Sequence, residues 1–170
     1  MEKSNHSNVL IVGGGCAGIA VASRINSLKS DLTISIVEPS EKSLYQAAWT
    51  LVGAGAYNVN DTIKPMSSVM PSYVKWIKEY AEEFLPDSNS LKTNGGTYTY
   101  DYLVVCPGLK LNYDGVAGLK ENLGKNNVCT NYSAEMATYT WDCLKQLDGG
   151  TLLFTEPPMP IKCAGAPQKI

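Results

Sequence analysis

The sequence predicts an α/β fold with a parallel sheet, an antiparallel β-meander and the start of a second α/β domain. Three observations lead to this prediction. A short β-branched run ends at a cluster of glycines, apolar residues at helical spacing follow, and a second buried run comes next. A strand, a tight turn, a helix and a strand within about 30 residues form a right-handed βαβ unit, whose two strands pair in parallel.

The first βαβ unit lies near the amino terminus. Val9–Val12 is continuously apolar, which is typical of a strand that is buried on both faces. After the glycines, apolar residues recur at three-residue spacing over Ile19–Leu28, as they do on one face of a helix. Leu32–Val37 predicts the second strand, and Glu38 follows it directly.

The middle of the chain predicts a small antiparallel meander over about residues 73–100. Two short runs, Ser90–Thr93 and Thr97–Tyr100, flank Asn94–Gly96, whose residues tolerate the positive φ of a tight hairpin turn. Tyr102–Val105 then predicts another buried strand of the sheet.

The last third of the chain predicts one helix and the opening of another domain. Helical spacing occurs within Asn131–Leu147, with Ser133 as a candidate N-cap. Thr151–Thr155 is a further apolar run, and the prolines after it exclude a helix or a central strand. We therefore expect one domain over residues 1–148 and the beginning of a second, truncated one over residues 149–170.

Composition limits the kinds of function that the chain can have. The 170 residues carry a net charge of −2, and the basic residues are spread along the chain, which argues against nucleic-acid binding. The five cysteines contain no CxxC pair, and His6 is the only histidine, so we expect no metal site and no Ser-His-Asp chemistry. A cofactor or a cysteine must therefore carry any reaction.

The glycine cluster matches a dinucleotide-binding motif. In Gly13-x-Gly15-x-x-Gly18, the first glycine permits a tight turn, the second lets a pyrophosphate approach the backbone, and the third allows close helix packing. Glu38, at the end of the second predicted strand, occupies the position of a carboxylate that binds ribose hydroxyls. The motif alone does not distinguish NAD from FAD.

Five segments carry a resemblance to a known family. They are Gly13–Gly18, Leu44–Gly53, Val74–Ile77, Tyr100–Gly108 and Pro160–Lys169. The first and fourth are shared by most flavoproteins with two dinucleotide-binding domains, whereas the second and the last are more specific. Together they resemble sulfide:quinone oxidoreductase, and in particular the branch that includes the mitochondrial enzymes.

The resemblance implies a Rossmann-like FAD-binding domain over residues 1–148, with a second dinucleotide-binding-like domain after it. It also implies which residues contact FAD. They are Gly13, Gly15, Cys16, Ala17 and Gly18 at the pyrophosphate, Glu38 at the adenosine ribose, Gln46 at the flavin, Ala81 at the adenine, and Gly108 in a backbone turn against the cofactor.

Cys163 is the catalytic residue that the resemblance implies. In the family, the matching cysteine forms a disulfide with a cysteine from the carboxyl-terminal half, and sulfide attacks that bridge to leave a persulfide. Lys162 would favour the thiolate if the fold points it inward. Cys129 is an alternative second redox cysteine, although the most similar branch does not use that position, and we expect Cys16 and Cys143 to be small packing groups.

The resemblance also implies substrates and a location. Sulfide and quinone would be the substrates, and peripheral membrane association would depend on a carboxyl-terminal part beyond this chain. The location would be the cytoplasmic side of the membrane in a bacterium and the mitochondrial inner membrane in a eukaryote. Homo-oligomers are compatible with the resemblance.

Two alternatives remain open. The chain could be a non-catalytic or truncated FAD-binding module, inactive by itself. It could also belong to another flavoprotein of the superfamily, such as the flavin subunit of flavocytochrome c sulfide dehydrogenase or a type II NADH dehydrogenase. Prolines follow Thr155 where a nicotinamide-binding relative has a second glycine motif, which disfavours NADH binding there.

Overall fold

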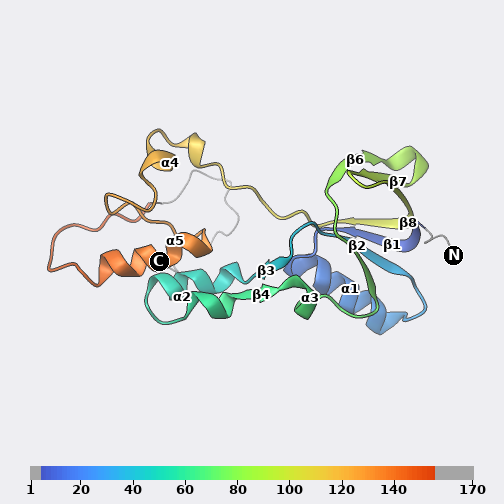
Figure 1. The fold of residues 1–170 in the computed structure, drawn as a ribbon, viewed down its shortest axis with the longest axis horizontal. Coiled ribbons are helices and arrows are strands. Elements are labelled where there is room, and N and C mark those ends of the chain that lie inside the picture. Colours follow the sequence, from blue (N-terminus) through green and yellow to red (C-terminus); the bar gives the residue numbers. More distant parts are fainter. Residues whose placement is uncertain (1–4, 156–170) are drawn as a thin grey trace. The chain divides into compact units, whose positions relative to one another are not determined.

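The computed structural model describes residues 5–155, and the chain divides into two compact units (Figure 1). Of the described residues, the first unit takes those within Met1–Ser43 and Lys64–Leu111. The second unit takes those within Leu44–Ile63 and Asn112–Ile170. Each unit is described by itself below.

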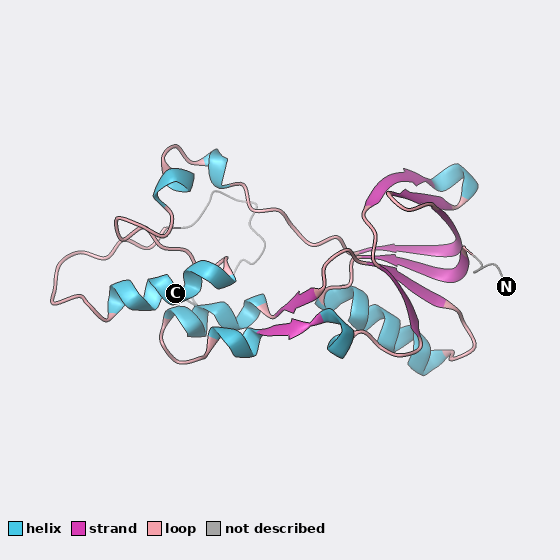
Figure 2. Cartoon of the chain, viewed as in Figure 1, coloured by secondary structure: helices cyan, strands magenta, loops and turns pink. Residues whose placement is uncertain are grey.

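The first unit is built on a mixed six-stranded sheet with the order β5-β2-β1-β8-β7-β6 (Figure 2). β1 pairs in parallel with β2 and with β8, β2 pairs in parallel with β5, and β6, β7 and β8 pair antiparallel. The α/β prediction is therefore confirmed. The elements are β1 (His6–Val12), α1 (Cys16–Leu28), β2 (Ile34–Val37), α3 (Met66–Val69), β5 (Val74–Ile77), β6 (Ala81–Leu85), the 3-10 turn η3 (Pro86–Ser88), β7 (Ser90–Thr93) and β8 (Thr97–Val105).

β1 lies at the centre of the sheet because both of its faces are apolar. Successive side chains of a strand point to opposite faces. Val9 and Ile11 accordingly pack with Ala22 of α1, whereas Leu10 and Val12 belong to a second cluster on the other face. Burial of one such side chain contributes about 1.5–3 kcal/mol to the stability of the fold. β1 is therefore held firmly, and so is the turn that follows its carboxyl end.

The meander differs from the prediction in its first strand. β5 pairs in parallel with β2, so the antiparallel part of the sheet begins at Ala81 and not near residue 73. The two runs expected at 97–100 and 102–105 form one strand, β8, which pairs with β7 at its start and with β1 over the rest. Pairing partners far apart in the sequence decide both features, and local patterns do not show them.

The second unit is mostly helical. α5 (Ala134–Leu144) follows Ser133 and confirms the helix predicted there. Trp49 and Val52 of α2 form a small core with Ala137 of α5, and the Trp49 indole donates to Thr62 Oγ1 at 3.1 Å. Its other elements are η1 (Gln46–Ala48), α2 (Trp49–Gly53), η2 (Val59–Thr62), η4 (Tyr113–Gly115) and α4 (Leu119–Asn122). A separate two-stranded sheet pairs β3 (Lys42–Leu44) with β4 (Ile63–Pro65), and the residues of both strands divide between the two units.

The strand expected at Thr151–Thr155 does not form, and its residues are exposed. An extended run becomes a strand only when another strand pairs with it, and none of the described residues does so here. The domain boundary at residue 148 remains a prediction. Within residues 5–155, no helix is both long enough and apolar enough to cross a membrane.

Candidate functional site

The turn after β1 requires glycine at its first position. Gly13 has a φ of +102°, in the left-handed region that side chains disfavour. A Cβ at this position would also overlap the carbonyl oxygen of Cys106, which directly follows β8. The turn that follows β1 therefore packs tightly against the residue that follows β8. At this point the Cys106 N–H donates to Val12 O at 2.7 Å.

Gly18, in the first turns of α1, allows the helix to approach the strand. It is buried, and a Cβ there would overlap Gly13 O and lie 3.3 Å from Ile11 Cγ2. Gly13 O belongs to the backbone and cannot rotate away. The absence of a side chain at Gly18 therefore sets the distance between α1 and the end of β1.

Gly15 is glycine for neither of these reasons. It is the N-cap of α1 with a φ of −74°, which other residues adopt freely, and a Cβ would have no atom within 4 Å. Gly15, Cys16 and Ala17 are all exposed. The first N–H groups of a helix lack partners within the helix and carry partial positive charge. Open space therefore adjoins an anion-binding helix terminus, and this fits a pyrophosphate that approaches the backbone.

Glu38 lies beside this turn. Its two carboxylate oxygens accept from Gly14 N and from Ser40 N, each at 2.8 Å. The Trp76 indole also donates to the Glu38 backbone carbonyl oxygen at 2.7 Å. A carboxylate oxygen accepts more than one hydrogen bond, so the carboxylate is held in place while it keeps capacity for hydroxyl donors such as those of a ribose.

The remaining predicted residues of the first unit lie at the same edge of the sheet or follow it. Gly13 and Glu38 directly follow the parallel strands β1 and β2, and Gly108, with a φ of +76°, is the third residue after β8. Ligands of open α/β sheets bind at this edge. Ala81 begins β6, shortly after β5 ends, and is half-buried against the core.

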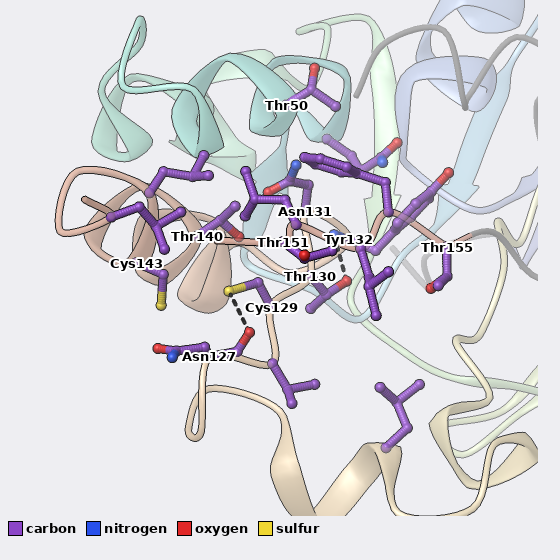
Figure 3. A pocket seen from close by; sticks show the side chains of 18 of the residues that line it. Thr50, Asn127, Cys129, Thr130, Asn131, Tyr132, Thr140, Cys143, Thr151 and Thr155 are labelled. Atoms are coloured by element: carbon purple, nitrogen blue, oxygen red, sulfur yellow. Dashed lines mark hydrogen bonds between the residues drawn. The ribbon is translucent and has the colours of Figure 1, made fainter. Parts of the chain in front are cut away.

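The other two predicted residues are placed differently. Gln46 belongs to the second unit, where it lines a cavity of about 780 Å³ formed by α2, α5 and the segments around residues 127–132 and 151–155 (Figure 3). That volume is in the range of pockets that hold small molecules. Cys163 lies outside the described residues, so its surroundings remain a prediction.

The wall of this cavity contains a polar group that the sequence analysis did not identify. The side-chain oxygen of Asn131 is buried and has no hydrogen-bond donor among the described residues. A Cβ on Gly53 of α2 would overlap this amide, so the two residues are in close contact. A buried acceptor without a donor is costly, and a donor in the cavity would satisfy it. An isolated asparagine gives no signal in a sequence.

Cys129 and Cys143 also line the cavity. Burial is the main cause that raises the pKa of the Cys129 thiol to about 11, the neighbouring Cys143 thiol contributes in the same direction, and the Thr140 side chain acts in the opposite direction. The thiol of Cys129 is therefore protonated at neutral pH and is a poor nucleophile there. The sequence analysis treated Cys143 as a packing group and did not place it beside Cys129.

Comparisons with known proteins agree with the motifs. The family model for pyridine nucleotide-disulphide oxidoreductase matches residues 7–137. The mitochondrial sulfide:quinone oxidoreductase of Mus musculus is 42% identical over 98% of this chain, and that of Dictyostelium discoideum is 45% identical over 99%. This chain spans only 37% and 38% of their respective lengths.

A solved structure shows the same arrangement. The sulfide:quinone oxidoreductase from Aquifex aeolicus superposes with a TM-score of 0.66 and 30% identity, over 82% of this chain and 31% of that one. The resemblance inferred from the five motifs is thus confirmed. The chain belongs to the pyridine nucleotide-disulphide oxidoreductase family, and its similarity within that family includes the sulfide:quinone oxidoreductases.

Proposed function

We propose that this chain is the FAD-binding part of a sulfide:quinone oxidoreductase. Membership of the family implies a flavin-type cofactor. The observation that carries the proposal is Gly15, because neither its backbone angles nor its neighbours require glycine. A ligand that approaches the backbone at the start of α1 accounts for this residue, and the pyrophosphate of FAD is such a ligand.

The proposal assigns a role to each residue. The N–H groups at Gly15, Cys16 and Ala17 would hold the pyrophosphate, with Gly13 and Gly18 shaping the turn. Glu38 would accept from the adenosine ribose hydroxyls. Gln46 would contact the flavin, Ala81 the adenine, and Gly108 would bring its turn against the cofactor.

The proposed reaction depends on Cys163. Hydrosulfide attacks the disulfide between Cys163 and a cysteine outside this chain, so that one S–S bond breaks and another forms, giving a persulfide and a thiolate. A bound flavin supplies a two-electron acceptor. A nucleophile such as a thiolate would take the sulfane sulfur from the persulfide and so free the second cysteine thiolate. The two thiolates would then re-form the disulfide, and the electron pair that this step releases would reduce quinone, which takes up two protons to become quinol. We take sulfide and quinone as substrates because both appear in the names of the similar proteins.

We extend the proposal to location. The similar proteins of Mus musculus and Dictyostelium discoideum are described as mitochondrial. A quinone substrate is lipid-soluble, so we propose that the protein works at a membrane surface, which would be the mitochondrial inner membrane in a eukaryote and the cytoplasmic membrane in a bacterium.

The test uses the full protein and two matched Gly→Ala substitutions. In Gly15→Ala, a methyl group enters the space proposed for the pyrophosphate, and we expect FAD affinity, measured by quenching of flavin fluorescence, to fall about tenfold or more, the effect of about 1.4 kcal/mol. Gly96→Ala is the control, since its Cβ would also meet no atom within 4 Å, but in a hairpin turn. Equal affinity of both variants would refute the assignment of Gly15.

A second measurement tests the chemistry. Anaerobic sulfide should bleach the flavin absorption of the wild-type protein and leave that of Cys163→Ser unchanged, because the variant lacks the sulfur that sulfide attacks. Bleaching of Cys163→Ser at the wild-type rate would remove Cys163 from the mechanism. Flavin binding without any response of the wild-type protein to sulfide would favour a non-catalytic FAD-binding module.

A further inference from the structure

The segment before Cys129 is a turn of fixed shape. Asn126 and Asn127 both have positive φ, at 53° and 59°. Two backbone hydrogen bonds close the turn, from Gly124 N to Val128 O and from Val128 N to Lys125 O, each 3.0 Å long. Cys129 directly follows this turn, so its position depends on where the turn is attached.

The turn is attached to α5. The N–H of Asn127 donates to Tyr139 Oη at 3.2 Å, and the Cys129 thiol donates to Asn127 O at 3.7 Å. Tyr139 and Cys143 are four residues apart in the helix and therefore lie on the same face. Asn127 and Cys129 thus run along this face beside Tyr139 and Cys143.

This arrangement places two thiols together on the cavity wall. Figure 3 draws the Cys129 and Cys143 side chains near each other on the cavity wall, the Cys143 thiol contributes to the raised pKa of Cys129, and neither sulfur is in a disulfide. Both cysteines are half-buried and line the cavity of about 780 Å³, so a small reagent in the cavity would reach them (Figure 3).

We propose that Cys129 and Cys143 are a dithiol site that closes to an intrachain disulfide by exchange with a low-molecular-weight disulfide, such as oxidised glutathione. The exchange itself does not rest on the proposed function, since it uses neither Cys163 nor the flavin, although Gln46, which we propose contacts the flavin, lines the same cavity. Closure would tie the turn before Cys129 to α5 and so change the wall of the cavity.

The exchange balances in two steps. Cys143 attacks the disulfide, its thiol proton is lost, and one molecule of the reduced thiol leaves. Cys129 then attacks the mixed disulfide at Cys143, loses its own proton and releases the second thiol. The two cysteines lose two electrons and two protons in all, and both are accounted for in the two thiols formed. Burial raises the pKa of Cys129 and disfavours its thiolate, so Cys129 takes the second step.

The lysines on either side of Cys129 and Cys143 allow one tryptic peptide to report on both cysteines. Trypsin cleaves after Lys125 and Lys145, so both cysteines fall in the single peptide Asn126–Lys145. The full protein is incubated with oxidised glutathione, the remaining thiols are alkylated in acid, and the digest is weighed by mass spectrometry. We expect this peptide to lack two hydrogens and to carry neither glutathione nor the alkylating group.

Two variants sharpen the result. Cys143→Ser should abolish the two-hydrogen loss, whereas Thr138→Ser, an exposed position on α5 in the same peptide, should keep it. Glutathione attached to either cysteine of the wild-type protein, or two alkylated thiols, would overturn the proposal. The wild-type measurement decides the question even if Cys143→Ser does not fold.

Discussion

Gly18→Ala should destabilise the first unit although it places alanine, the best helix former, in a helix. The new Cβ would overlap Gly13 O and lie 3.3 Å from Ile11 Cγ2. Overpacking of this kind costs about 1–3 kcal/mol, and the upper part of the range applies because the obstacle is backbone. Replacing glycine within a helix returns about 0.5–1 kcal/mol. The net loss should therefore be about 2 kcal/mol.

Hydrogen exchange measures this loss in one unit at a time, because each amide reports the free energy of its own opening. A loss of about 2 kcal/mol makes exchange of the β1 amides about 25-fold faster. Gly96→Ala is the control, with open space around its Cβ in the same unit, and its exchange rates should match the wild type. Slower or unchanged exchange in Gly18→Ala would refute the close approach of α1 to β1.

Three further predictions concern other contacts. Gly53→Ala would drive a Cβ into the Asn131 amide and should lower the free energy of unfolding of the second unit by about 1–3 kcal/mol in denaturant titrations. Trp76→Phe removes the donor to the Glu38 carbonyl and should lower the opening free energy of β5 amides by about 1 kcal/mol in hydrogen exchange. Because the pKa of Cys129 is raised to about 11 in the folded protein, against about 8.5 when unfolded, the folded state binds more protons between these values. Stability should therefore fall as pH rises from about 9 to 11, and Cys129→Ser should make this slope shallower in unfolding curves measured against pH.

The βαβ unit could be predicted because its signals are local. The apolar run of β1, the glycines after it and the helical spacing of α1 adjoin one another in the sequence, and the structure confirms each. The place of β5 could not be predicted in this way. The sequence analysis included its residues in the meander, and only its pairing with β2, far away in the sequence, puts it in the parallel part of the sheet.

The residues of the candidate site also fall into those with local signals in the sequence and those without. The turn residues and Glu38 were accessible from the sequence because a strand end and its loop are contiguous. Cys129 and Cys143 were not recognised as neighbours, because the position of Cys129 beside α5 depends on two asparagines with positive φ and on the Tyr139 hydroxyl. Neither feature has a pattern that distinguishes it from an ordinary polar loop and an ordinary helix.

The three glycines of the motif do not have equal value as evidence of a cofactor. Gly13 and Gly18 are required by this chain itself, one by its φ and both by backbone atoms that a Cβ would overlap. A descendant that lost its cofactor would still need them in order to fold. Gly15 has no such requirement, so a chain without a ligand at this turn would be free to change it. The presence of glycine at position 15 is therefore the part of the motif that indicates binding, while the other two positions indicate only the fold.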